Sequence, residues 1–294
     1  MRRRAAKRPL PFRLTLTHGI PTREAYKAQL LLLDPNGDGE IDDAERQLQL
    51  AIEREAQERI AAALRKQYRD ILPPNAADMS VDEILTYVDV HLANNQAIAD
   101  AINRTVQNAA DLGVNIALDQ LQGAGVGFDY TLVHTAARDW ARQYGAQLVR
   151  NVTDTTREAI RQSVSRWYEN GEPLSALRND LLTTIFSERR AQLIAMTETT
   201  KAAAEGTHIG YVESGVVTEE VWLTVSDERV CPYCGALNGQ VVSIGGSFFD
   251  KLPDELRTGL EQRIARNPNV RFARPPAHPG CRCRIGARVV PIGQ

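Results

Sequence analysis

Four cysteines and one histidine with the spacing of metal ligands lie near the C-terminal end of this 294-residue chain. The motif CPYC places two thiols close together, and the motif HPGCRC follows more than forty residues later. Thiolate and imidazole groups are the ligands that Zn²⁺ prefers, and a C-x-x-C turn can present two sulfurs to one ion. We therefore predict a closed structural zinc site that takes two ligands from each motif. The candidate ligands are Cys231, Cys234, His278, Cys281 and Cys283.

Three other interpretations of this cluster stay open at this point: a reduced cluster without metal, a disulfide, and a catalytic zinc. The chain shows neither a signal peptide nor a stretch of ~20 apolar residues, so we expect a soluble intracellular protein with reduced thiols, which disfavours the disulfide. A catalytic zinc keeps one position for water and needs a general base. Because the sequence contains neither HExxH nor H-x-E followed by PCxxC, we assign no catalytic residue.

An acidic loop in the N-terminal part has the spacing of a calcium site. The segment DPNGDGEIDDAE matches the EF-hand template D-x-[DN]-x-[DN]-G-x5-E, which surrounds Ca²⁺ with about six to eight oxygens. The predicted Ca²⁺ ligands are Asp34, Asn36, Asp38, Glu40, Asp42 and Glu45. The alternative is a solvated turn between two helices. Since sensor proteins usually pair two such loops, we expect this single copy to brace a helix pair.

Two stretches are strongly basic although the formal net charge is only -2. Residues 2–23 contain arginine and lysine but no acid, and the arginines between Arg257 and Arg288 are accompanied by a single acid, Glu261. Such a density can neutralise phosphates and produce salt-dependent, sequence-independent binding to DNA. The alternatives are a solvated tail and a solvated face paired with nearby acids. The candidates for nucleic-acid contact are Arg2, Arg3, Arg4, Arg271, Arg274, Arg282 and Arg284.

Helical periodicity fills most of the chain between residues 44 and 215. One long amphipathic helix is predicted over 44–72, where two prolines end it, and another from about 81 to 111, closed by the sequence DLGVN. The glycine-rich segment LQGAGVGF is predicted to be a linker. Further helices follow it, with Gly171 near a C-terminal cap. The last of them is predicted to start at Ser187 as N-cap and to stop at Gly215.

The pattern changes near residue 216. VVTEEVWLTV alternates like a strand, LNGQVVSI carries the Asn-Gly signal of a hairpin, DELRTGLEQRIA is helical, and CRCRI suggests a last strand. We predict a mainly α fold: a long-helix body with an N-terminal EF-hand-like loop and a small C-terminal α+β module stapled by zinc, because so small a core needs support. The predicted units are a basic arm (1–20), the EF-hand-like segment with its long helix (21–75), the helical body (76–215) and the zinc-binding module (216–294).

Three segments together resemble a known family. RRAQLIAMTETTKAAAEG, VWLTVSDERVCPYCGALNGQVV and PPAHPGCRCRI are similar to the signatures of the phage head morphogenesis proteins, also called Mu F-like minor head proteins. The resemblance covers about residues 130 to 290 and leaves the calcium-loop region outside it. The motif residues that it marks, besides the histidine and cysteines of HPGCRC, are Arg190, Ala191, Thr197, Glu198, Trp222, Asp227, Arg229 and Gly239.

This resemblance implies a non-enzymatic minor virion protein in the capsid interior, made in the host cytoplasm and placed next to the portal. It further implies partners in procapsid assembly and in DNA packaging or ejection: the portal protein, the major capsid or scaffolding protein, and phage DNA, with no membrane involved. Thr197 and Glu198 are expected to bond to the module that follows, with Arg190 as their ion-pair partner. Asp227 and Arg229 are expected to orient the zinc ligands. The rival hypotheses are a zinc-dependent enzyme acting on nucleic acid or protein, and a calcium-regulated DNA-binding module.

Overall fold

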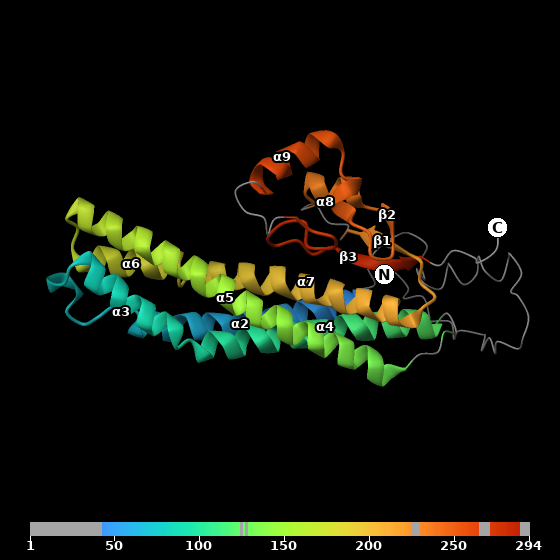
Figure 1. Ribbon diagram of the computed structural model, residues 1–294, viewed down its shortest axis with the longest axis horizontal. Helices are drawn as coiled ribbons and strands as arrows, with labels where there is room; N and C mark the ends of the chain where they lie inside the picture. The colour runs from blue at the N-terminus through green and yellow to red at the C-terminus, as the bar shows by residue number, and fades with distance from the viewer. Residues whose placement is uncertain (1–42, 124–125, 127–128, 225–229, 265–270, 289–294) are drawn as a thin grey trace, which may run out of the picture.

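The computed structural model describes residues 43–123, 126, 129–224, 230–264 and 271–288. Long helices form a body, and a small lobe of short helices and strands, the C-terminal module, lies against one side of it, next to α7 (Figure 1). The helices of the body are α2 (Asp43–Asp70), α3 (Val81–Ala93), α4 (Gln96–Gly123), α5 (Tyr130–Asn170), α6 (Leu174–Thr184) and α7 (Glu188–Ser214). The 3-10 turn η1 (Ala76–Asp78) joins α2 to α3.

The body is held together mainly by an apolar core that α2 to α7 share. Helix α2 confirms the predicted long helix: its side chains at helical spacing, among them Ala56, Ile60 and Leu64, are buried against α4 and α7. The helix ends before Pro73, which has no N–H to continue it. The predicted division of the chain at residue 75 remains a prediction, and α2 packs into the same core as the helices after it.

The second predicted helix is wrong in two respects. The chain breaks between α3 and α4 at Asn94 and Asn95, and α4 then continues through Gly113 to Gly123. Gly113 does not end a helix because it serves helix packing: a Cβ at this position would lie 1.9 Å from the backbone oxygen of Ala203 in α7. A Cβ at Gly206 of α7 would likewise lie 2.1 Å from a backbone oxygen of α4. The sequence DLGVN therefore marks a close crossing of two helices.

The caps of the later helices confirm the predicted boundaries. Asp129 caps α5, and Gly171 ends it with φ 63° in the left-handed region, where glycine is favoured. The Ser187 side chain accepts a hydrogen bond from the Arg190 N–H at the start of α7, and Gly215 ends that helix with φ 66°. These two caps set the length of the helix on which the C-terminal module rests.

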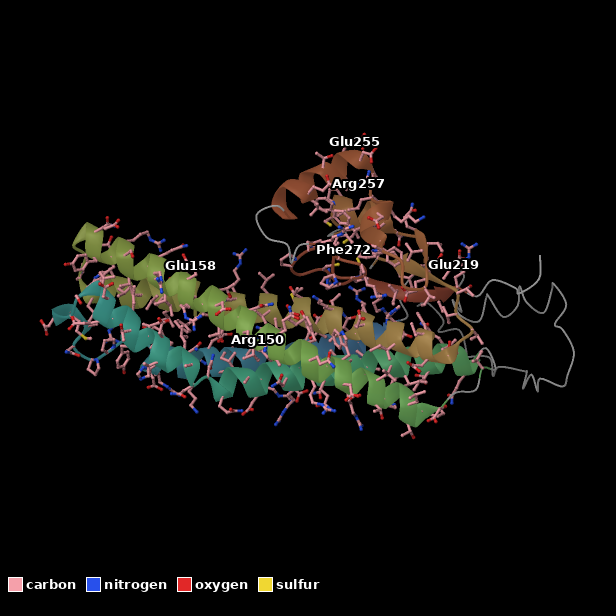
Figure 2. All side chains as sticks on the ribbon, viewed as in Figure 1. Arg150, Glu158, Glu219, Glu255, Arg257 and Phe272 are labelled. Carbon is pink, nitrogen blue, oxygen red and sulfur yellow. The ribbon has the colours of Figure 1, made fainter. Side chains whose placement is uncertain are left out.

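The C-terminal module contains a three-stranded antiparallel sheet in the order β2-β1-β3. Its elements are β1 (Glu219–Leu223), α8 (Pro232–Leu237), β2 (Val241–Ser243), η2 (Phe248–Lys251), α9 (Asp254–Ile264) and β3 (Arg284–Arg288). Trp222 of β1 is fully buried, and the rings of Phe248 and Phe272 pack against it. This aromatic cluster belongs to a second apolar core, to which Ala117, Leu121 and Tyr211 of the body also contribute. Side chains on α9 such as Glu255 lie on the outer side of the module, away from the body (Figure 2).

The predicted Asn-Gly hairpin is wrong in its first half. Asn238 and Gly239 follow helix α8 instead of a strand, and β2 pairs with β1, which lies before that helix. Gly239 adopts φ 74° and donates its N–H to the Trp222 oxygen, so the turn returns the chain to the edge of β1. Among the described residues no helix is long and apolar enough to cross a membrane. The mainly helical body and the small C-terminal α+β module are confirmed.

Candidate metal centre

The motif CPYC forms a short knuckle at the start of α8. Cys231 is the N-cap of the helix, Pro232 occupies the first helical position, and Cys234 lies one turn later with its side chain buried. The Cys231 sulfur accepts a hydrogen bond from the Cys234 N–H over 3.4 Å. The turn therefore directs both sulfurs to the same side, as the C-x-x-C spacing predicts.

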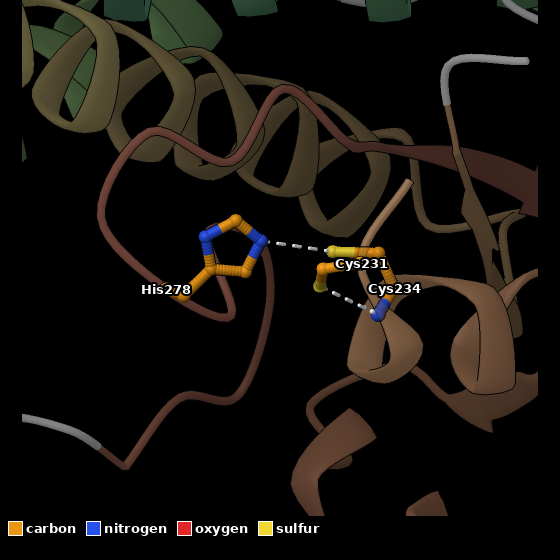
Figure 3. Close-up of side chains that lie close together, drawn as sticks. All are labelled: Cys231, Cys234 and His278. Atoms are coloured by element: carbon orange, nitrogen blue, oxygen red, sulfur yellow. Dashed lines mark hydrogen bonds between the residues drawn. The ribbon is translucent and has the colours of Figure 1, made fainter. Parts of the chain in front are cut away.

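The motif HPGCRC forms a tight loop that faces this knuckle (Figure 3). Gly280 has φ 77°, and the Cys281 N–H returns to the His278 oxygen over 3.1 Å. The His278 Nδ1 lies 2.9 Å from the Pro279 oxygen; because a carbonyl can only accept, Nδ1 is the donor. In the neutral ring Nε2 then carries the lone pair, and a ligating histidine is commonly held in this way.

The two motifs converge on Cys234. Its sulfur lies 3.4 Å from the His278 Nε2 and 3.6 Å from the Cys281 sulfur. Bonds of about 2.3 Å to sulfur and about 2.0 Å to nitrogen place neighbouring donors of a zinc tetrahedron about 3.5 to 3.8 Å apart. Two groups of donors, each within 4.8 Å, share Cys234: one with Cys231 and His278, the other with Cys281 and Cys283. All five predicted ligands are therefore gathered in one place, and their chemistry fits Zn²⁺.

The buried thiols stabilise one thiolate even without a metal. Hydrogen bonds from Cys234 and Cys283 lower the pKa of the Cys281 thiol to about 3. The hydrogen bond to Cys281 raises the pKa of the Cys234 thiol, so this neighbour holds its proton. A metal ion would displace the remaining protons because it binds thiolates, which makes the affinity of the cluster for zinc depend on pH.

Two threonines of α7 hold the loop that carries the second motif. The Gly280 N–H donates to the Thr197 hydroxyl over 3.0 Å, and the Thr200 hydroxyl donates to the Cys281 oxygen over 2.8 Å. Thr200 is fully buried, so the alternative to this bond is an unpaired carbonyl in the interior, which costs about 1 to 3 kcal/mol. The expected contact of Thr197 with the module is present. Thr200 was not singled out in the sequence, although it stands beside the other motif residues.

The family model described as phage Mu protein F like protein matches residues 155–286. Over this segment the chain is similar to the phage Mu F-like family. The segment, called the Mu F-like region below, runs from the middle of α5 to β3 and includes all five candidate ligands. Comparisons with curated proteins and with solved structures found no match.

Other motif residues of the Mu F-like region hold the body together. Arg190 donates to the Ile185 oxygen over 2.9 Å and to the Thr156 hydroxyl over 2.9 Å, so it joins α7 to α5 and to the end of α6. Glu198 accepts from the Tyr144 hydroxyl of α5 over 2.6 Å, and burial raises the pKa of Glu198. The expected bond from Glu198 to the module and the expected ion pair with Arg190 are therefore wrong, because both side chains face α5.

A network of charged side chains forms a second attachment of the C-terminal module to α7. His208 Nδ1 lies 2.6 Å from Glu220 Oε1 of β1, and Arg274 Nη2 lies 2.8 Å from His208 Nε2. Arg274 also pairs with Glu205 of α7 over 3.2 Å. Glu220 is fully buried and Arg274 is nearly so, which makes this pairing necessary for the burial of their charges.

These pairings change the interpretation of the basic stretch. Arg274 and Arg284 were nucleic-acid candidates, but both are buried in ion pairs, the latter with Glu45 at the start of α2. A guanidinium group held in this way is not available to phosphate, so we assign these two a structural role. Arg271 is exposed and lies 3.6 Å from Asp250, and Arg282 lines the cavity beside the cysteines. The candidates Arg2, Arg3 and Arg4 lie outside the described residues.

Several other predicted residues also lie outside the described part of the chain. They are the calcium-loop residues Asp34, Asn36, Asp38, Glu40 and Asp42, and the two residues expected to orient the zinc ligands, Asp227 and Arg229. The described calcium candidate, Glu45, contacts Arg284 of β3. Calcium binding therefore remains a prediction, and it would have to compete with this ion pair for the carboxylate of Glu45.

Helix α2 contributes to the centre in a way that the sequence did not reveal. Gln49 and Glu53 are buried on the α2 face that lies toward the loop of the HPGCRC motif (residues 278–283), called the ligand loop below. The Gln49 side chain bonds to the Thr200 hydroxyl over 3.1 Å. A cavity of about 410 Å³ lies between this face, α7 and the ligand loop, and the half-buried Cys231 and His278 contribute to its wall. The role of these two residues could not be predicted from the sequence, because more than 150 positions separate α2 from the cysteines that it adjoins.

Proposed function

We propose that Cys231, Cys234, His278 and Cys281 hold one structural Zn²⁺ that fastens the C-terminal module. The distances from the Cys234 sulfur to His278 Nε2 and to the Cys281 sulfur support this set, since they match two edges of a zinc tetrahedron. Cys283 is then the spare thiol; it is buried and lies within 4.8 Å of the Cys234 and Cys281 sulfurs. The module's own core is small, and bound zinc adds folding free energy that such a core lacks.

At the level of the whole protein, we propose a minor component of the phage head that stands next to the portal. In this role it takes part in procapsid assembly and in DNA packaging or ejection, in the capsid interior after assembly in the host cytoplasm. The observation that carries this proposal is the match of residues 155–286 to the phage Mu F-like family. The long, rigid body offers an extended surface for a portal or capsid partner, and the zinc-fastened module fixes a second surface at one angle to it.

Co-purification tests this proposal. The full chain is co-expressed with the portal protein encoded by the same phage, and each complex is isolated through a tag on the portal. We expect the wild-type chain to be captured, and Cys234→Ser to lose both zinc and capture. Gly235→Ala on the same helix is the matched control, since its new Cβ meets only Val230 at an ordinary 3.7 Å. Capsids that assemble, package DNA and infect normally without the protein contradict the proposed role.

One observation favours a second candidate function, a zinc-dependent enzyme acting on nucleic acid or protein. The cavity beside the metal centre is walled by the half-buried His278 and Cys231 and by the carboxyl-bearing Glu53. A catalytic zinc needs an exchangeable water and a general base in such a place. Replacement of zinc by cobalt distinguishes the two functions: a spectrum of four protein ligands that added anions leave unchanged supports the structural role, and one that responds to anions supports the enzyme.

A further inference from the structure

Three buried polar side chains connect α2 with the loop that carries the metal ligands. The Gln49 Nε2 donates one hydrogen to Glu53 Oε1 over 3.2 Å and the other to the Thr200 hydroxyl over 3.1 Å. The Thr200 hydroxyl in turn donates to the Cys281 oxygen over 2.8 Å. Gln49, Glu53 and Thr200 are 5%, 6% and 1% exposed. The chain of bonds is internally consistent because each hydrogen has one acceptor.

This chain of bonds fixes the peptide group that follows Cys281. The Thr200 hydroxyl is one of two side-chain anchors of the loop, the other being the Thr197 hydroxyl on the Gly280 N–H. Thr197 donates its own proton within α7, to the Leu193 oxygen. The Thr200 hydroxyl differs because it also accepts a hydrogen bond from α2, donated by Gln49 Nε2. The orientation of the Cys281 sulfur toward Cys234 therefore depends on a helix outside the C-terminal module.

A second contact brings the same two segments together. Arg284 of β3, one residue after the cysteine motif, pairs with Glu45 at the start of α2, and its side chain is 8% exposed. The contacts of Glu45 and Gln49 with these segments lie about one helical turn apart along α2. The end of the ligand loop is thus attached to α2 at two points. The Cys281 oxygen is attached through Thr200, and Arg284 is attached directly through Glu45.

We propose that Gln49 and Thr200 are positioning residues for the zinc ligands, so that α2 helps to orient the ligands of the metal centre. This inference rests on the proposed zinc site. It extends the centre beyond the Mu F-like region, because residues 43–70 precede the matched segment. Linkage makes the effect reciprocal: if the docked helix raises zinc affinity, bound zinc holds the helix in its docked position. Zinc then joins α2, the first described helix, to the C-terminal end of the described chain.

Zinc affinity of full-length variants tests the first half of this inference. Competition with a chromophoric chelator at neutral pH is measured for the wild type, Thr200→Val and Thr200→Ser. Loss of a group that orients a ligand typically weakens metal binding about 10- to 100-fold, and we expect this for Thr200→Val. Thr200→Ser keeps the hydroxyl and should stay within about twofold of the wild type.

The matched control is Thr207→Val on the same helix. Thr207 is also buried and donates to backbone oxygens, of Gly113 and Ala203, but it has no contact with the ligand loop among the described residues. We expect this variant to lower the melting temperature of the metal-free protein while its zinc affinity stays within about twofold of the wild type. If Thr200 only supports the fold, Thr200→Val should behave like Thr207→Val: a lower melting temperature and a zinc affinity within about twofold of the wild type.

Hydrogen exchange tests the reciprocal half and does not depend on Thr200→Val being folded. We expect zinc to slow exchange of the amides around Gln49 in the wild type, and Gln49→Met to remove most of that difference. Equal zinc affinity of Gln49→Met, Thr200→Val and the wild type overturns this inference alone, as does exchange in α2 that zinc leaves unchanged. A wild-type protein that is folded and binds no zinc overturns the proposed function as well.

Discussion

The buried carboxyl group of Glu53 gives the sharpest prediction of how stability depends on pH. Burial raises the pKa of Glu53 from 4.5 to about 7, while the hydrogen bond from Gln49 and the charge of Arg282 oppose this shift. The side chain is 6% exposed, so solvent screens little of the effect. We expect Glu53→Gln, which resembles the protonated form and can still accept from Gln49, to stabilise the protein at alkaline pH.

The sign and size of this effect follow from proton linkage. Below pH 4.5 the folded and unfolded states both carry the proton, so the two proteins should be about equally stable. Between pH 4.5 and 7 the unfolded state releases the proton first, and the wild type loses about 1.4 kcal/mol per pH unit relative to the variant. Above pH 7 the difference should level off at about 3 kcal/mol in favour of Glu53→Gln.

Equilibrium unfolding by urea at pH 4.5, 6 and 8 measures this difference, with wild type and variant at equal zinc concentration. Glu58→Gln is the control, since Glu58 is exposed on the same helix and its replacement should change stability by less than about 0.5 kcal/mol at each pH. A difference between Glu53→Gln and the wild type that does not grow from pH 4.5 to pH 8 would refute the reasoning. It would mean that the carboxylate is well solvated or firmly paired.

Three further predictions concern the attachments within the fold, each measured by urea unfolding. Gly206→Ala should cost about 3 kcal/mol or more, because its Cβ would lie 2.1 Å from a backbone oxygen of α4; a near-neutral result would mean that α4 and α7 are not in close contact. Ser80→Ala should cost about 1 kcal/mol, since it removes the capping box of α3. Arg284→Met should cost about 3 kcal/mol by leaving Glu45 without this partner, and adding Glu45→Gln should recover part of the loss; additive losses would argue against the ion pair.

Local signals in the sequence predicted much of the body. Ser187, Gly171 and Gly215 occupy the caps expected of them because capping depends on a few neighbouring residues. The break between α3 and α4 and the continuation of α4 through Gly113 were not predictable from such signals. A glycine in a helical pattern looks like an end, and only the approach of α7 explains why this one lies inside a helix.

The candidate site was predictable in its chemistry and not in its surroundings. Cysteine and histidine spacing named all five possible ligands, because ligand types are few and their spacing in a knuckle is narrow. The contribution of Gln49 was invisible, since glutamine on a helix is ordinary and its partner Thr200 lies 151 positions away. The density of arginines suggested an exposed basic surface, yet Arg274 and Arg284 form ion pairs with partly or fully buried acids that lie far from them in the sequence.

Native mass spectrometry of the full-length protein, purified without added metal and with its thiols kept reduced, tests the central claim most directly. We predict a mass that exceeds that of the polypeptide by one zinc ion. Cys234→Ser should lose that ion, because the Cys234 sulfur is the donor that lies close to both His278 and Cys281 of the second motif. A folded wild-type protein with the mass of the bare polypeptide would contradict the claim that zinc fastens the C-terminal module.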